Sequence, residues 1–203
     1  MTVPLHRTQE SRSTETRTRV LDATVDCLVG LGYAGTTTAA VQARAGVSRG
    51  ALMHHFGSKT ELLVAAVRHL AEQRGANLVR EARALTEGED RTSQAIDLLW
   101  ETFTGPLFTA TLELWAASRT DEELRDAVLE FERPLRQHLN TAMKSLFGDA
   151  VAARPAFAEA IELTLQFMRG AALTTILRAD AARQHGVIER WKSVFTALIE
   201  EAV

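Results

Sequence analysis

The feature that most constrains this fold is the stretch 36–56, in which two short helical patterns flank a single glycine. Threonines precede the first pattern, and a Thr hydroxyl can accept the free backbone N–H groups of a helix start. Gly46 stands where that helix must end, because glycine adopts a left-handed helix end without steric cost. Ser48 then caps a second short helix. Two helices joined by a tight, glycine-containing turn form a helix-turn-helix, so the stretch predicts that motif.

The second helix of the motif has an apolar side and an open side. Leu52 and Phe56 lie four residues apart, so they share one face and can anchor the helix to a core. At about 100° per residue, Gly50, Ala51, Met53 and His54 point away from that anchor, and Arg49 and His55 lie on the flanks. Such a helix suits the major groove of DNA, where a glycine lets the backbone approach closely. An ordinary helical hairpin in an all-α core is the alternative.

The next helix adds a phosphate-binding candidate. Ser58 is positioned as its N-cap and Lys59 follows, so a lysine and free helix N–H groups could hold a DNA phosphate. Residues 1–60 carry a net charge of about +3 and the remainder about −6, which fits a phosphate-binding end on an acidic body. The predicted DNA-contacting residues are Thr37, Thr38, Ser48, Arg49, Gly50, Ala51, Met53, His54, His55 and Lys59.

These motifs together resemble the DNA-binding domain of the TetR family of transcriptional regulators, over about the first third of the chain. The resemblance rests on a long first helix ending in Leu31-Gly32-Tyr33, a Thr-Thr pair, an Ala-Gly-Val-Ser turn, a His-Phe ending and a Ser-Lys-x-x-Leu helix start, all in order. Two positions depart from the family pattern. Met53 replaces a frequent tyrosine, and Gln42 stands where a small alanine is usual, so the operator sequence does not follow from the family.

Composition favours an all-α chain. Of its 203 residues 46% are hydrophobic, and Ala, Leu, Glu and Arg, which favour helix, are abundant. Cys27 is interpreted as a small buried hydrophobe rather than a redox sensor, and a single cysteine fits a reducing cytoplasm. No apolar run is long enough to span a membrane.

The breaks in the pattern predict the organisation of the chain. We expect residues 1–12 to form a disordered arm, 13–60 the helix-turn-helix DNA-binding domain, and 61–203 a regulatory ligand-binding and dimerisation domain. Arginines at 7, 12 and 17 could touch DNA, with a solvated tail as the alternative. Beyond the motif, helices are expected at 13–31, 58–84, 92–103, 106–118, 121–146, 156–180 and 187–202. That makes about nine helices, which the resemblance also implies.

The penultimate predicted helix combines apolar bulk with small residues that permit close helix approach, and the last predicted helix carries several large apolar residues. The resemblance implies that they pair with a second copy, and two-fold symmetry would then match a palindromic operator. Burial within one chain is the alternative. The predicted dimer-contacting residues are Leu163, Gly170, Ala171, Thr174, Trp191, Phe195 and Leu198.

The resemblance also implies a ligand pocket walled by the middle helices. Its candidates are aromatic, Leu and Met residues, whose alternative role is ordinary core: Trp100, Phe103, Phe108, Leu112, Trp115, Phe131, Phe167 and Met168. Polar neighbours that could orient a ligand are Glu113, Arg119, His138 and Gln166. The apolar bias favours an apolar or aromatic effector.

Signatures of catalysis are missing from the sequence. It has no His-Glu-x-x-His, Cys-x-x-Cys or phosphate-cradling Gly/Lys loop, and no serine sits in a strand–turn–helix elbow. We therefore expect no catalytic residue, metal or cofactor. The predicted function is a cytoplasmic, homodimeric DNA-binding repressor released by a small ligand. The alternatives are a helical small-molecule enzyme and a dimeric adaptor that does not bind DNA.

Overall fold

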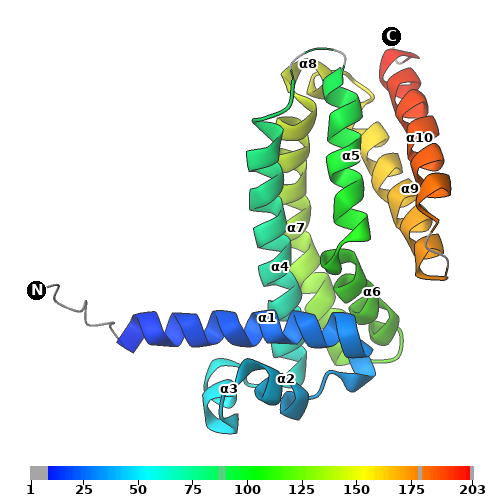
Figure 1. The fold of residues 1–203 in the computed structure, drawn as a ribbon. Coiled ribbons are helices and arrows are strands. Elements are labelled where there is room, and N and C mark those ends of the chain that lie inside the picture. Colours follow the sequence, from blue (N-terminus) through cyan, green and yellow to red (C-terminus); the bar gives the residue numbers. More distant parts are fainter. Residues whose placement is uncertain (1–8, 87, 89, 178–179, 202–203) are drawn as a thin grey trace, which may run out of the picture. The chain divides into compact units, whose positions relative to one another are not determined.

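The computed structural model describes residues 9–86, 88, 90–177 and 180–201, which form ten helices and no strand (Figure 1). The all-α prediction is therefore confirmed. The helices are α1 (Gln9–Gly35), α2 (Thr38–Ala45), α3 (Arg49–His55), α4 (Lys59–Ala82), α5 (Asp90–Thr104), α6 (Pro106–Ser118), α7 (Glu122–Phe147), α8 (Asp149–Ala152), α9 (Phe157–Leu177) and α10 (Ala181–Glu201).

The first helix starts earlier and ends differently from the expected range 13–31. Helix α1 begins at Gln9, so residues 9–12, which we expected in a disordered arm, are helical. The rest of that expected arm, residues 1–8, lies outside the described residues. Gly32 interrupts α1 with φ 68° and ψ 178°, a conformation that suits glycine. The chain therefore turns at the predicted Leu31-Gly32-Tyr33 site, although a last helical turn follows it.

Two other differences concern the C-terminal third. The short helix α8 was not expected, and it follows Gly148, whose carbonyl accepts the Ala152 N–H at 2.9 Å. Helix α10 begins at Ala181 rather than at 187, because Asp180 caps it: its Oδ1 accepts the Arg183 N–H at 3.0 Å. Gly186 was taken as a break but lies inside the helix, at a cost of about 1 kcal/mol relative to alanine.

The chain divides into two compact units. The first contains the residues up to Ala71 together with Thr109–Glu132, and the second contains Glu72–Phe108 and the residues from Arg133 onward. The first unit thus holds the helix-turn-helix and the α6–α7 turn. Our expected boundary at residue 60 assigned that turn to the regulatory domain. Helices α4, α6 and α7 each contribute residues to both units.

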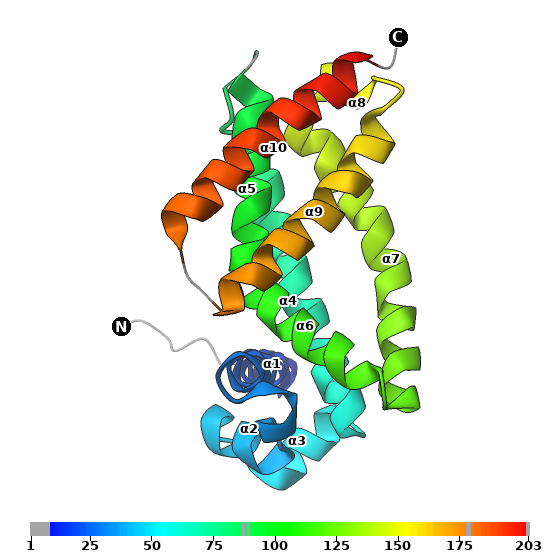
Figure 2. The same ribbon diagram turned by 90° about the vertical axis from the view of Figure 1, so that its right-hand side faces the viewer.

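In the first unit, α1 packs on α2 and α3, as Figure 2 shows. Its core combines one side of α1 with the apolar anchors of the motif. Leu52 and Phe56 are each 1% exposed, as their spacing predicted. The buried cluster contains Val20, Leu21, Ala23, Val25, Cys27, Val41, Ala45, Leu52, Phe56, Leu62 and Ala66.

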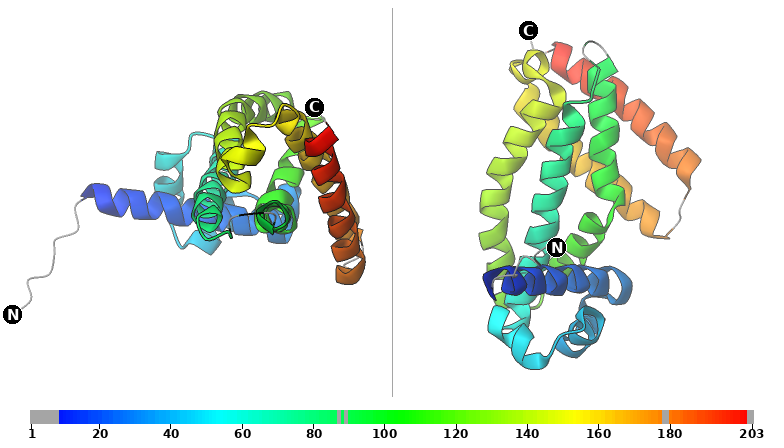
Figure 3. Two further views of the ribbon diagram at one scale, coloured as in Figure 1. Left: turned by 90° about the horizontal axis from the view of Figure 1, so that it is seen from above. Right: turned by 60° about the vertical axis from the view of Figure 1, so that its left-hand side comes forward.

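In the second unit, α10 packs against α5 and α9 (Figure 3). Aromatic rings fill the centre, where Phe147 stacks on Phe195 at 4.9 Å and meets the edge of Phe157 at 5.9 Å between centroids. Arg91 fastens two helix ends by donating hydrogen bonds to carbonyls of α4 and α7, where a cation complements the helix dipole. Within the described residues no helix is long and apolar enough to cross a membrane.

Candidate nucleic-acid interface

The caps of the motif hold its two short helices in place. The Thr37 hydroxyl accepts the Ala40 N–H at 3.1 Å at the start of α2, and the Ser48 hydroxyl accepts the Ala51 N–H at 3.2 Å at the start of α3. Gly46 closes α2 in the left-handed conformation, with φ 63° and ψ 39°. The two caps and the glycine turn predicted from the sequence are confirmed, and they fix how α3 leaves the turn.

Helix α3 presents the face that its sequence predicted. Leu52 and Phe56 anchor it, while Met53 on the opposite side is 44% exposed. Arg49, Gly50 and His54 are exposed as well, and Ala51 and His55 are half-buried. The accessible side therefore offers a guanidinium, imidazoles, a thioether and a bare glycine backbone. These are groups that can meet base edges, thymine methyls and phosphates.

The start of α4 is closed by a reciprocal cap. The Ser58 hydroxyl accepts the Glu61 N–H at 3.0 Å, and the Glu61 carboxylate accepts the Gly57 N–H at 2.8 Å. Lys59 does not extend outward from this turn. Its Nζ donates a 3.3 Å hydrogen bond to the Tyr33 carbonyl and lies 4.3 Å from the centre of the Tyr33 ring. The phosphate contact of Lys59 stays a prediction, with a structural role now visible beside it.

Tyr33 connects the end of α1 to α6 and to the turn before α7 within the first unit. Its N–H donates to Glu113 Oε2 at 2.6 Å, and its hydroxyl donates to Asp121 Oδ2 at 3.1 Å. Burial and the hydrogen bond to Asp121 raise the pKa of the Tyr33 phenol above its ordinary value of 10.0. Sequence reasoning missed this junction, because its partners lie 80 and 88 residues away along the chain.

Two side chains bear on alternatives left open by the sequence. Cys27 is buried, and burial raises the pKa of its thiol, which disfavours the reactive thiolate. This supports the small-hydrophobe interpretation over a redox sensor. Arg17 lies in α1, with its guanidinium 5.3 Å from the centre of the Phe56 ring. That position next to α3 could not be foreseen, since it depends on how α1 crosses the motif.

The ligand candidates fall in both units. Leu112, Trp115 and Phe131 belong to the first, where the Trp115 indole N–H donates to Glu132 at 2.7 Å. The other candidates belong to the second: Trp100, Phe103, Phe108, Phe167 and Met168. Phe103 and Phe108 are in ring contact at 5.7 Å. Met168 is fully buried. Their pocket role stays a prediction.

The polar neighbours proposed for a ligand have varied surroundings. Glu113 accepts the Tyr33 N–H, Arg119 is exposed, and Gln166 accepts a hydrogen bond from Arg169 at 3.2 Å. The His138 side chain lies outside the described residues.

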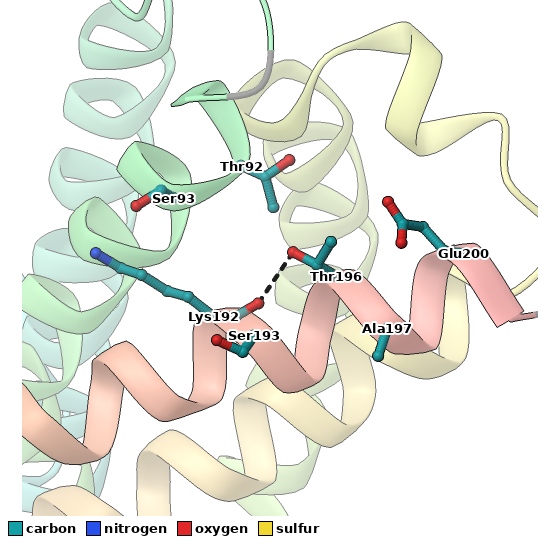
Figure 4. Close-up of a pocket in the computed structure, with 7 residues that line it drawn as sticks. All are labelled: Thr92, Ser93, Lys192, Ser193, Thr196, Ala197 and Glu200. Atoms are coloured by element: carbon teal, nitrogen blue, oxygen red, sulfur yellow. Dashed lines mark hydrogen bonds between the residues drawn. The ribbon is translucent and has the colours of Figure 1, made fainter.

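A hollow of about 430 Å³ lies elsewhere in the second unit, between the first turns of α5 and the C-terminal half of α10 (Figure 4). It is lined by Thr92, Ser93, Lys192, Ser193, Thr196, Ala197 and Glu200. A second hollow of about 290 Å³ lies beside Arg91. None of the eight ligand candidates lines either one.

The predicted dimer residues are partly surface and partly core. Leu163, Gly170 and Thr174 lie on the exposed side of α9, while Ala171, Trp191 and Leu198 are half-buried. Leu173, 45% exposed, extends the apolar surface of α9, and Val194 does the same on α10. Phe195 has no exposed surface, because it stacks on Phe147 inside the second unit. Phe195 is therefore a core residue of this chain, and its contact with a second copy stays a prediction.

Trp191 also has an internal role. Its ring stacks on Phe167 at 4.1 Å, and its indole N–H donates to the Thr164 hydroxyl at 3.2 Å. Trp191, predicted for the dimer, and Phe167, predicted for the ligand pocket, therefore pack against each other.

The capped motif with its exposed α3 face defines a DNA-binding protein of the helix-turn-helix class. Comparison with known proteins agrees, since residues 20–66 match the family described as "Bacterial regulatory proteins, tetR family". The transcriptional regulator BetI of Paraburkholderia xenovorans (strain LB400) is 32% identical over 158 residues, which cover 76% of this chain and 81% of that protein. The regulator CymR of Pseudomonas putida is 37% identical over 125 residues, 62% of each chain. The chain belongs to the TetR family of transcriptional regulators and is not an enzyme.

Solved structures show the same fold at low identity. A transcriptional regulator from Saccharomonospora viridis, determined in complex with choline, matches with a TM-score of 0.64 and 18% identity. The match covers 92% of this chain and 96% of that one. The multidrug binding protein EbrR, complexed with imidazole, matches with a TM-score of 0.58 and 24% identity, over 90% and 94% of the two chains.

Proposed function

We propose that this regulator is a homodimeric repressor that binds a palindromic operator and is released by a small apolar or aromatic ligand. The observation that carries the DNA-binding part is the exposed face of α3, held by caps at Thr37 and Ser48 and anchored by Leu52 and Phe56. A guanidinium, two imidazoles and a glycine together on that face argue against the alternative of an adaptor that does not bind DNA.

Arg49 is the residue that we propose for base reading. It is exposed at the first turn of α3, and the first residues of a recognition helix commonly reach base edges. A guanidinium can bond guanine in a bidentate manner, which contributes about 1–3 kcal/mol of discrimination. Met53, exposed on the same helix, is suited to a thymine methyl, because it lacks a polar group.

The dimer is proposed from the surface of α9 and α10. Exposed Leu163 and Leu173 flank Gly170 on α9, and Val194 is 45% exposed on α10. The glycine lets a partner helix approach closely. The large apolar side chains beside it can then bury hydrophobic area against that helix. Two copies would present two α3 helices to successive major grooves of a palindromic site.

Release is proposed as a population shift. Helix α4 supplies residues to both units, so a displacement of α4 caused by ligand can alter how far apart the two α3 helices lie. The ligand must bind the released state more tightly, because equal affinity for both states shifts nothing. The aromatic candidates of the second unit, Trp100 and Phe103 among them, support an apolar or aromatic ligand. The imidazole complex of the similar EbrR fold makes that aromatic compound the first to screen.

The experiment starts from binding-site selection on random duplex DNA, followed by footprinting. We expect a protected palindrome that resists nonspecific competitor. Arg49→Ala should weaken binding to that site by about 1–3 kcal/mol and relax the preference at one base pair in each half. Arg154→Ala is the matched control, since Arg154 is an exposed arginine of the second unit.

Four outcomes would contradict the proposal. Selection that enriches no sequence argues against specific DNA binding. A single unpaired half-site argues against the symmetric dimer. Equal losses of DNA affinity in Arg49→Ala and Arg154→Ala would mean that Arg49 acts through general electrostatics and not through base reading. The repressor part is tested by placing the selected site upstream of a reporter, where higher expression in the presence of the protein would contradict it.

A further inference from the structure

Three cationic or imidazole side chains gather at the C-terminal end of α3. The rings of His54 and His55 meet edge to face with centroids 5.4 Å apart, and His55 is tilted against Phe56 at 6.2 Å. From α1, the Arg17 guanidinium lies 5.3 Å from the centre of the same Phe56 ring. Arg17 from α1 and His55 from α3 thus lie beside one buried ring, and His54 lies beside His55.

We propose that Arg17, His54 and His55 form a single phosphate-binding cluster in which the His55 imidazole takes up a proton when the protein binds DNA. The proposal rests on the DNA-binding function proposed above and names a regulator of it, the pH. It also adds Arg17 of α1 to the interface.

The Phe56 ring is an immobile surface on which the cluster is held. Phe56 is 1% exposed, so it is immobilised in the core of the first unit. A guanidinium on an aromatic face is held by cation–π attraction while its N–H groups stay directed along its own plane. Arg17 is exposed, so that its donors are accessible to a phosphate. Ordering Arg17 before DNA arrives reduces the entropy lost on binding.

Burial of His55 and the charges around it disfavour its protonation in the free protein. Burial, then the neighbouring His54, then Arg17 lower the pKa of the His55 imidazole from its ordinary value of 6.5. Three acids of the first unit have partners other than His55: Glu61 accepts the Gly57 N–H, Asp26 of α1 pairs with Arg44 of α2, and Asp22 of α1 contacts His69 of α4. Lys59, at the start of α4, is turned onto Tyr33. The two groups whose charge lowers the pKa of His55 are therefore a cation, Arg17, and a potential cation, His54.

A DNA phosphate would reverse that balance. A negative charge within a few ångströms stabilises imidazolium, so the bound state holds protons more tightly than the free state. By linkage, affinity must then rise as the pH falls through the interval between the free and bound pKa values. Each proton taken up places one more positive charge against the DNA phosphates. The salt dependence should therefore steepen by about 0.9 per proton at the acidic end.

The test uses the full-length protein and the duplex obtained by site selection, at constant ionic strength between pH 6.0 and 8.0. We expect affinity to increase about tenfold or more on acidification, as uptake of one proton over this range implies. Calorimetry in two buffers with different heats of ionisation measures that uptake directly on the unmodified protein. The same duplex with a scrambled site shows whether uptake follows phosphate contact alone.

Variants assign the effect to the cluster. His54→Gln combined with His55→Gln should abolish proton uptake, and Arg17→Gln should lower the slope of log affinity against log salt by about one. His185→Gln is the matched control, since His185 is an exposed histidine of the second unit and should leave the pH dependence unchanged. Because His55 is half-buried, circular dichroism of each variant confirms the fold.

The possible failures can be told apart. Specific DNA binding without proton uptake by the unmodified protein overturns the cluster and leaves the proposed function standing. Uptake that persists in the folded double variant also overturns it. If the unmodified protein binds no duplex at any pH, both the proposed function and this inference fall.

Discussion

Gly170 allows the proposed dimer surface to be tested without damaging the fold of the single chain. It lies on the exposed side of α9, and a Cβ added there meets no atom within 4 Å. Gly170→Gln should therefore stabilise the isolated helix by about 0.5–1 kcal/mol, because glycine is a poor helix former. If a second α9 packs closely at this point, the same side chain is an obstruction.

The cost to association follows from packing. Forcing extra atoms into a well-packed contact typically costs about 1–3 kcal/mol, and a two-fold axis doubles it to about 2–6 kcal/mol. At about 1.4 kcal/mol per factor of ten, the dimer Kd should rise at least about 30-fold. Sedimentation velocity over a concentration series measures this Kd. Circular dichroism should meanwhile show undiminished helix content.

Gly75→Gln is the matched control. Gly75 lies inside α4, and a Cβ there also meets no atom within 4 Å. This variant should gain the same helix stability and leave the Kd unchanged. A Gly170→Gln protein that dimerises with the original affinity would refute the assignment of this α9 surface to the dimer.

Two further predictions concern the motif and its support. Lys59→Ala should lower the slope of log affinity against log salt by about one if Lys59 holds a phosphate. Binding titrations between about 50 and about 200 mM salt measure this slope. An unchanged slope would leave Lys59 only its contact with Tyr33. The raised pKa of the Tyr33 phenol means that the folded state holds this proton more tightly than the unfolded state. Its stabilising contribution is therefore fully present below pH 10 and is lost as the pH rises through the folded pKa. In urea unfolding above pH 10, Tyr33→Phe should lose less stability with rising pH than the unmodified protein, and parallel curves would contradict the reasoning.

Short-range rules were enough to predict the motif. Capping by Thr37 and Ser48, the left-handed glycine at 46 and the spacing of Leu52 and Phe56 are all decided within four or five residues along the chain. Such interactions depend on local backbone geometry, so a sequence pattern reveals them. The exposed face of α3 followed from the same periodicity.

Boundaries failed where one local signal competed with another. Gly186 marked a break in the pattern, but the Asp180 cap and continued backbone hydrogen bonding carried α10 through it. The one-turn helix α8 was missed because Gly148 and Pro155 both indicated interruption, and a single turn between two breaks leaves no periodicity to read.

The sequence by itself determined that the chain is helical and that it carries a capped reading helix with an open face. Tertiary structure decided which aromatic residues are core, since the periodicity of Phe195 is the same whether it meets a second chain or Phe147. It also decided that Arg17 would lie over Phe56, and that Tyr33 would bind carboxylates at 113 and 121. Those contacts join residues from about 40 to almost 90 positions apart, and only the packing of whole helices brings such distant groups together.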